Sequence, residues 1–140
     1  MTDVQANNNN EPAAAENFVP EEKKKFKERH TFEERLAEAQ KKKTQNPKLV
    51  PVIVERHERS KLPDLEKSKF LVSGDLKQYE FLLNIKQKLK LNKTEALYFF
   101  SGSKRIDKPN TLIKEIYEVA QDKDEFLYIT YAELETFGSN

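Results

Sequence analysis

The sequence lacks the residues on which many kinds of site depend. It has no cysteine, and only three of its 140 residues are glycines. Without cysteine the chain cannot form a disulfide, hold a metal through thiolates or use a cysteine nucleophile. The only histidines, His30 and His57, have no cysteine ligands beside them, so we expect no metal site. No glycine-rich loop is present to cradle a phosphate, and we expect no cofactor.

Long hydrophobic runs are also missing. The longest apolar stretch, residues 49–54, has six residues even when Pro51 is counted, whereas a helix needs about 20 to span a bilayer. The N-terminus has neither the basic nor the apolar region of a signal peptide. Thr2 excludes the usual N-myristoylation motif, which requires glycine at that position. We therefore expect a soluble, cytoplasmic chain.

The residues that are present favour one small domain with a highly charged surface. Hydrophobic residues make up 36% of the chain and charged residues 35%. The net charge of +1 hides an asymmetry, because residues 26–48 carry seven Lys/Arg against four acids, whereas residues 112–140 carry seven acids against two lysines. Oppositely charged faces of this kind steer protein partners. A nucleic-acid binder would be more basic overall, so we expect no nucleic-acid partner.

The chain divides into an extension and a folded part. Residues 1–20, rich in Asn, Ala and Pro, bury too little to order themselves and predict disorder. The domain is predicted over residues 21–137, ending in a flexible tail. A short helix is expected over 21–30, with Phe26 as its anchor. Thr31 and Glu34 form a capping-box pattern that opens a second helix, running to about Lys43.

Four strands are predicted from β-branched and aromatic runs at residues 49–56, 69–73, 97–100 and 126–131. An ordered loop is expected over 57–68. A third helix, capped by Asp75, and a fourth over 111–120 lie between the later strands. This order predicts an α+β fold, the ubiquitin-like β-grasp, with a four-stranded mixed sheet and two extra N-terminal helices. The first and last strands should be parallel and central.

Several segments carry a recognisable pattern, among them Pro51–Glu55, Lys69–Val72, Asp122–Tyr131 and the ending Thr136-Phe137-Gly138. Together they resemble the autophagy ubiquitin-like modifiers, the family of the microtubule-associated light chains and the GABA-receptor-associated protein. The resemblance implies that a cysteine protease cleaves the Gly138–Ser139 bond. Activating and conjugating enzymes would then join Gly138 to phosphatidylethanolamine. The protein would thus be a conjugated modifier and not an enzyme, with no catalytic residues of its own.

Glycine suits such a reactive end because it has no Cβ and can pass through a narrow enzyme channel in extended form. Attachment of two acyl chains anchors a protein stably, whereas one gives marginal binding. The modified protein is therefore expected on autophagosomes and in the vacuole or lysosome. The alternative is that Gly138 is only part of a frayed tail and that the domain is an unconjugated interaction module.

The resemblance also implies a groove for peptides that carry an aromatic residue and, three positions later, an aliphatic one, as in cargo receptors. Residues 69–72 should form an edge strand to which the peptide adds. The first pocket is matched by Glu38, Pro51, Ile53, Lys69, Leu71 and Phe126. The second is matched by Phe70, Val72, Leu76 and Phe81. Acidic flanks of the peptide would meet Lys48, Lys67 and Lys88. For Ile53 and Phe126 a place in the core is an equally good interpretation.

Some positions depart from the family pattern. Lys42 replaces an aliphatic residue of the first pocket, Asn84 one of the second, and Ser73 a proline. We expect Lys42 to favour peptides with acidic flanks. Tyr98 and Phe100 match aromatics that the family uses for recognition by its enzymes. The lysine runs 23–25 and 41–43 leave open a third interpretation, an adaptor for RNA, microtubules or anionic lipid.

Overall fold

The computed structural model describes residues 24–134 of the chain. The elements, in chain order, are α2 (Phe26–Arg29), α3 (Phe32–Gln45), β2 (Leu49–Arg56), β3 (Lys69–Ser73), α4 (Gln78–Lys88), β4 (Tyr98–Ser101), β5 (Lys104–Arg105), α5 (Ile113–Ala120) and β6 (Leu127–Ala132). The predicted order is confirmed, with one strand added. The predicted extension, residues 1–20, lies outside the described residues. Within residues 24–134 no helix is long and apolar enough to cross a membrane.

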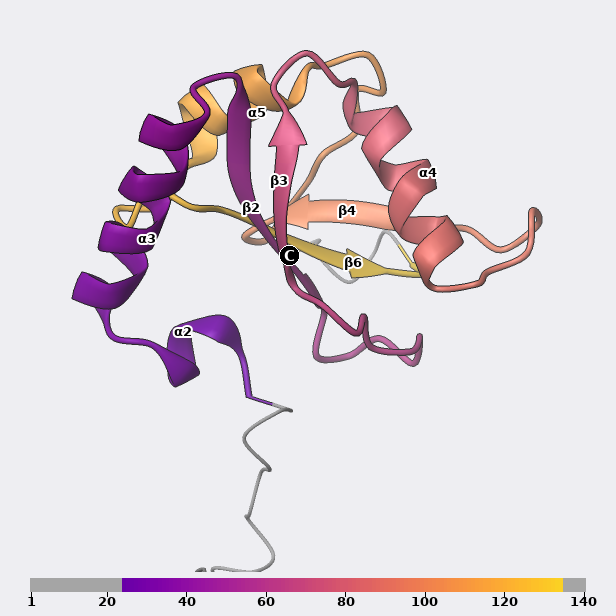
Figure 1. Cartoon of the computed structure of the whole chain (residues 1–140). Coiled ribbons are helices and arrows are strands. Elements are labelled where there is room, and N and C mark those ends of the chain that lie inside the picture. The colour runs from indigo at the N-terminus through magenta and orange to yellow at the C-terminus, as the bar shows by residue number, and fades with distance from the viewer. Residues whose placement is uncertain (1–23, 135–140) are drawn as a thin grey trace, which may run out of the picture.

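One mixed sheet with the strand order β3-β2-β6-β4-β5 forms the centre of the fold (Figure 1). β2 runs antiparallel to β3 and parallel to β6, which confirms the predicted central pair. Pro51 is tolerated in β2 because the ladder to β6 begins only at Val52, so no hydrogen bond to β6 is lost. The sheet has five strands and not four, because a turn at Gly102, with φ of 63°, folds β5 back onto β4.

The two faces of the sheet are covered by different helices (Figure 1). Val52 and Val54 point to the face covered by α4 and α5, where Phe81, Ile85 and Ile116 complete the larger core. Neighbouring residues on a strand point to opposite faces, so Ile53 points to the face covered by α2 and α3. A smaller cluster fills that second face: Phe26, Ala39, Ile53 and Phe126, with Tyr128 packed against it.

Two helix caps were predicted from the sequence, and the structure has one of them. The capping box of α3 is confirmed, because Glu34 N–H donates to Thr31 Oγ1 at 3.1 Å and Thr31 N–H to Glu34 Oε1 at 2.9 Å. The prediction that Asp75 caps the next helix is wrong. Lys77 forms a bridge with Leu112 and keeps an extended backbone, so α4 begins at Gln78. Asp75 instead accepts a hydrogen bond from Lys114 Nζ at 2.9 Å.

Candidate functional site

Strand β3 lies at the edge of the sheet, between α3 and α4 in Figure 1. Val54 N–H donates to the Ser68 carbonyl at 2.8 Å, and Gly74 N–H donates to the Lys48 carbonyl at 3.0 Å. Backbone groups alternate in direction along an antiparallel strand, so residues 68, 70, 72 and 74 face β2. The N–H and C=O groups of Lys69 and Leu71 therefore point away from the sheet. They are open to a further strand.

A groove of about 300 Å³ lies between β3 and α4, and we call it the α4 groove. All four residues predicted for the second pocket line it: Phe70, Val72, Leu76 and Phe81. The rings of Phe70 and Phe81 meet edge to face with centroids 5.9 Å apart, and Lys88 Nζ lies 5.9 Å from the Phe70 centroid. Asn84 also lines the groove and gives it a polar wall.

The six residues predicted for the first pocket lie in two layers. Leu71 is 43% exposed, and Lys69 makes an ion pair with Glu38 on α3, so these three form an open rim. Ile53 and Phe126 are fully buried in the smaller core, where the Phe26 ring packs edge-on against Phe126 at 5.1 Å. Pro51 is buried and lies opposite Leu71 in the register. The rim is therefore accessible at the surface, whereas the buried layer is covered by Phe26 of α2 and Ala39 of α3.

The three lysines predicted to meet acidic flanks do not form one cluster. Lys88 lines the α4 groove. Lys67 lies just before β3 and lines a different pocket. Lys48 is exposed just ahead of β2, where its carbonyl accepts from Gly74 N–H. Lys42, in the last turn of α3, is half-buried. Ser73, at the end of β3, lines the α4 groove and is exposed.

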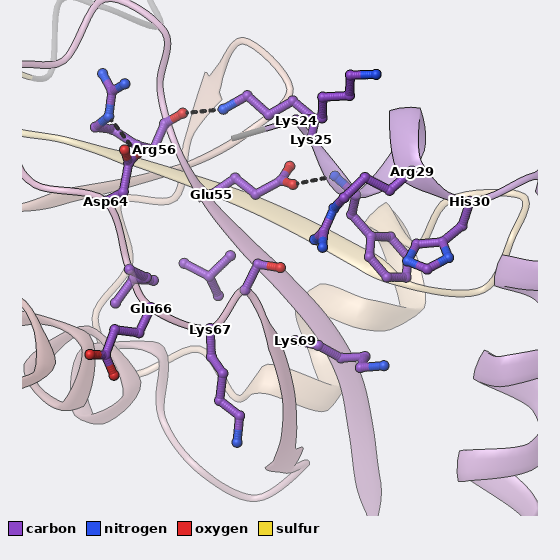
Figure 2. Close-up of a pocket in the computed structure, with 14 residues that line it drawn as sticks. Lys24, Lys25, Arg29, His30, Glu55, Arg56, Asp64, Glu66, Lys67 and Lys69 are labelled. Carbon is purple, nitrogen blue, oxygen red and sulfur yellow. Dashed lines mark hydrogen bonds and ion pairs between the residues drawn. The ribbon is translucent and has the colours of Figure 1, made fainter. Parts of the chain in front are cut away.

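A second cavity, of about 540 Å³, lies between α2, the end of β2 and residues 64–69, and we call it the basic pocket. Figure 2 shows the ion pair and hydrogen bonds at its rim. Lys25 Nζ donates to the Arg56 carbonyl at 2.7 Å, and Arg56 Nε pairs with Asp64 at 2.9 Å. Phe26 N–H donates to Glu55 at 2.7 Å. The pocket adjoins the exposed edge of the sheet through Lys69, which belongs to both.

The loop between α5 and β6 attaches the N-terminal helices to the sheet. Asp124 is completely buried. Its carboxylate accepts hydrogen bonds from Arg35 Nη1 at 2.6 Å, Tyr128 Oη at 2.5 Å and Phe126 N–H at 2.9 Å. Burial and the bond to Asp124 raise the pKa of Tyr128 well above its usual range. Burial opposes the charge on Arg35, but its contacts with Tyr128 and Asp124 outweigh this and raise its pKa. These groups hold α3 against β6.

The last described residues are attached to the loop that follows β2. Ser60 Oγ donates to Glu133 Oε1 at 2.6 Å, and Lys61 N–H donates to Glu133 Oε2 at 3.1 Å. Tyr131 Oη donates to the Pro63 carbonyl at 2.6 Å. Burial acts to raise the pKa of Glu133, but the hydrogen bonds from Ser60 and Lys61 outweigh it and lower that pKa. The predicted reactive end at Gly138 lies outside the described residues.

The two aromatics predicted for enzyme recognition differ in exposure. Tyr98 is half-buried, with the Arg105 guanidinium 4.6 Å from its ring centroid. Phe100 is completely buried and packs edge-on against His57 at 6.2 Å. Tyr98 is therefore accessible at the surface, whereas Phe100 belongs to the core. No group of three or more His, Asp or Glu residues that would suit a metal ion is found within residues 24–134.

Sequence reasoning missed the two carboxylates that hold the fold together at these positions. Asp124 lies in the polar run 122–125, which gives no sign of burial. The spacing Asp124-x-x-x-Tyr128 was the one available signal, because a tyrosine inside a strand needs a partner for its hydroxyl. Nothing in the sequence links Ser60 with Glu133, since the contact depends on how the loop 57–68 folds.

The chain is similar to known autophagy proteins. The family model described as autophagy protein Atg8, ubiquitin-like, matches residues 34–138. Autophagy-related protein 8B of Oryza sativa subsp. indica is 39% identical over 116 residues, 83% of this chain and 97% of that protein. Autophagy-related protein 8d of Arabidopsis thaliana is 40% identical, over 81% of this chain and 93% of that protein. The crystal structure of Trypanosoma brucei ATG8 superposes with a TM-score of 0.74 at 30% identity, covering 78% of this chain and 93% of that one.

Proposed function

Because the chain belongs to the Atg8 family of ubiquitin-like autophagy proteins, we propose that it is a lipid-conjugated modifier that recruits cargo receptors. In this proposal Gly138 is freed by a cysteine protease, is joined to phosphatidylethanolamine and holds the domain on autophagosomal membranes. The family match runs to residue 138 and leaves only Ser139 and Asn140 beyond it. This observation carries the proposal for the C-terminus.

The chemistry requires activation by other proteins. Hydrolysis of the Gly138–Ser139 amide adds water across the C–N bond and leaves a glycine carboxylate, which is a poor electrophile. An activating enzyme makes the acyl adenylate from ATP with release of pyrophosphate, and an enzyme thiol then displaces AMP to form a thioester. The amine of phosphatidylethanolamine attacks the thioester carbonyl and releases the thiol. The domain itself contributes a surface that these enzymes recognise, for which Tyr98 is the accessible candidate.

Recruitment is proposed to use the open edge of β3 and the α4 groove. A peptide that adds beside β3 pairs its backbone with Lys69 and Leu71. Its aliphatic residue enters the α4 groove, against Phe70 and Phe81, and its aromatic residue contacts the rim at Leu71. The interface is smaller than a standard protein–protein contact, so an affinity on the order of micromolar is expected.

The deciding experiment is the C-terminal mass of the protein isolated from starved cells. We expect a population that ends at Gly138 and a population that carries phosphatidylethanolamine at that residue. Gly138→Ala should remove the lipid-bearing population, while a Ser139→Ala control should keep it. A wild-type chain that always retains Ser139-Asn140 and never carries lipid would instead indicate an unconjugated interaction module.

A further inference from the structure

The basic pocket has more positive than negative side chains along its walls. Three carboxylates line it, and two of these have partners, because Asp64 pairs with Arg56 and Glu55 accepts from the backbone of Phe26. Six lysines and arginines line it: Lys24, Lys25, Arg29, Arg56, Lys67 and Lys69. Arg56 pairs with Asp64, and Lys69 pairs with Glu38. Lys24, Lys25, Arg29 and Lys67 still leave the cavity of about 540 Å³ with an excess of positive charge, which suits a ligand that brings negative charge.

Two of these cations lack either a hydrogen-bond acceptor or an ion-pair partner within residues 24–134. The Nε atom of Arg29 is buried and has no hydrogen-bond acceptor there. A buried donor left unsatisfied costs about 1–3 kcal/mol. Lys67 is exposed and lacks a carboxylate partner among the same residues. Figure 2 shows the two side chains coming from different elements, Arg29 from α2 and Lys67 from the segment before β3. A carboxylate inside the pocket could accept a hydrogen bond from Arg29 Nε and form an ion pair with Lys67.

The chain itself holds a segment of the required charge next to the pocket. Residues 1–22 contain no lysine or arginine and five acids: Asp3, Glu11, Glu16, Glu21 and Glu22. The segment joins the described chain close to Lys24, which lines the pocket. Glu16 is eight residues before Lys24, a reach of roughly 26–29 Å when extended. That span is long enough for its carboxylate to enter the pocket from the side of Lys24.

We propose that the N-terminal segment, residues 1–22, occupies the basic pocket of its own chain through Glu11, Glu16, Glu21 and Glu22. Tethering holds this segment at an effective concentration on the order of millimolar, so weak contacts suffice for substantial occupancy. Because the pocket adjoins the edge of β3, the segment competes with acidic stretches of a bound peptide. This competition rests on the proposed function, whereas the intramolecular contact does not.

The contact is tested with one spin label on the full-length chain. The absence of cysteine lets Ala15→Cys carry a nitroxide at a single position. At low salt we expect strong broadening of the amide signals of Arg29, Lys67 and Lys69. The broadening should fall at least twofold when the four glutamates are replaced by glutamine. It should fall by a similar factor in Lys67→Glu. Lys93→Glu, an exposed lysine outside the pocket, is the matched control and should leave it unchanged.

Two results would overturn the contact. One is broadening at the pocket that is the same with glutamates and with glutamines. The other comes from a mixture of two copies, one isotope-labelled without a spin label and one spin-labelled without isotopes. Equally strong broadening in the isotope-labelled copy would mean that a second molecule supplies the segment.

The competition is tested with two synthetic peptides, four glutamates followed by Trp-Ala-Ala-Leu and the same motif after four glutamines. The acidic peptide should bind the glutamine-substituted chain about 2–10-fold more tightly than the natural chain. The neutral peptide should bind both alike. If neither peptide binds although the pocket amides are broadened, the proposed peptide recognition fails and the contact stands. If the acidic peptide binds both chains equally without broadening, the inference fails and the proposed function stands.

Discussion

At the scale of single residues, the buried carboxylate of Asp124 decides whether α3 stays on the sheet. A buried ion pair adds little net stability, but removing one partner leaves a charge in a place where it cannot be solvated. Arg35→Met should therefore lower the free energy of unfolding by about 2–3 kcal/mol, since Tyr128 and Phe126 N–H still bond the carboxylate. Urea denaturation measures the loss.

The control for this variant is an exposed arginine. Arg59→Met changes the same charge on the surface of the loop after β2 and should shift stability by less than about 0.5 kcal/mol. Restoring a neutral pair in Arg35→Met/Asp124→Asn should recover part of the loss, because the unpaired charge is then gone. Equal stability of Arg35→Met and the natural chain would contradict the role given to this pair.

Glu133 joins the end of the described chain to the loop that follows β2. Its carboxylate bonds Ser60 Oγ and Lys61 N–H, and these bonds lower its pKa. A lowered pKa in the folded state stabilises at pH values above the unfolded pKa of about 4.3, and this stabilisation is lost as pH falls through the folded value. We expect Glu133→Gln to raise the hydrogen-exchange rate of the Lys61 amide about tenfold at pH 7 and to make little difference at pH 3.

The comparison variant is Glu118→Gln on the exposed side of α5, which removes the same charge and should leave the Lys61 amide unchanged. An unchanged exchange rate in Glu133→Gln at pH 7 would mean that the loop is ordered without this carboxylate.

At the scale of elements, β3 is an edge strand in which the backbone groups of Lys69 and Leu71 point away from the sheet. Proline removes one N–H and is tolerated where that N–H faces away from the sheet. Leu71→Pro should therefore leave the domain folded and lower its free energy of unfolding by about 1 kcal/mol or less. It should nevertheless weaken the binding of a synthetic aromatic-x-x-aliphatic peptide at least tenfold. Isothermal titration calorimetry and thermal melting by circular dichroism measure the two effects separately.

Two matched variants separate the backbone from the side chain. Leu71→Ala keeps the N–H and should lose less affinity than Leu71→Pro. Phe70→Pro removes an N–H that faces β2 and should destabilise the fold by about 3 kcal/mol or more. If Leu71→Ala and Leu71→Pro bind the peptide equally, strand addition at this position is not the mode of binding.

Most of the elements could be predicted from the sequence because their patterns are local. The β-branched run 49–56 identifies a buried strand whatever lies around it, and Thr31 with Glu34 identifies a helix start. β5 was missed because two residues carry no periodicity. Asp75 was assigned the wrong role because a cap pattern cannot show that Lys77 pairs with Leu112.

For the candidate site, the sequence predicted which residues lie together but not how deeply each one is buried. The four residues of the second pocket do line one groove, since strand alternation and helix spacing place them together. The six residues of the first pocket separate into an exposed rim and a buried layer. That depth depends on how closely Phe26 and Ala39 pack on Ile53 and Phe126, which residue types alone do not reveal.

At the scale of the whole molecule, the two faces of the sheet have unequal cores. Within residues 24–134, fourteen buried residues form the core beneath α4 and α5, whereas four form the one beneath α2 and α3. The smaller face depends correspondingly more on ion pairs to the loop before β6. Lys27 pairs with Asp122 at 2.8 Å and Lys43 with Glu125 at 3.0 Å, in addition to the buried pair of Arg35 with Asp124.

Acid should therefore loosen the N-terminal helices before it unfolds the rest. Burial acts to raise the pKa of Asp122, but Lys27 and the Asp124 N–H outweigh it and lower that pKa; Lys43 and Gln40 lower that of Glu125. Because both pKa values are lowered in the folded state, these pairs stabilise the fold fully above the unfolded pKa values, about 3.9 for Asp and 4.3 for Glu. This stabilisation is lost as the pH falls below those values. Between about pH 4 and pH 2 the amides of α3 should lose exchange protection while those of α5 keep theirs.

Phe26→Ala provides the test that this order of opening belongs to the smaller core. The substitution removes the ring that packs on Phe126 and should cost about 3 kcal/mol or more. It should also raise the pH at which α3 loses protection, while α5, which rests on the larger core, keeps its protection. The contrary result is that α3 and α5 lose hydrogen-exchange protection at one common pH, both in the natural chain and in Phe26→Ala. The two faces would then unfold as a single unit, and the ion pairs before β6 would stabilise the whole domain.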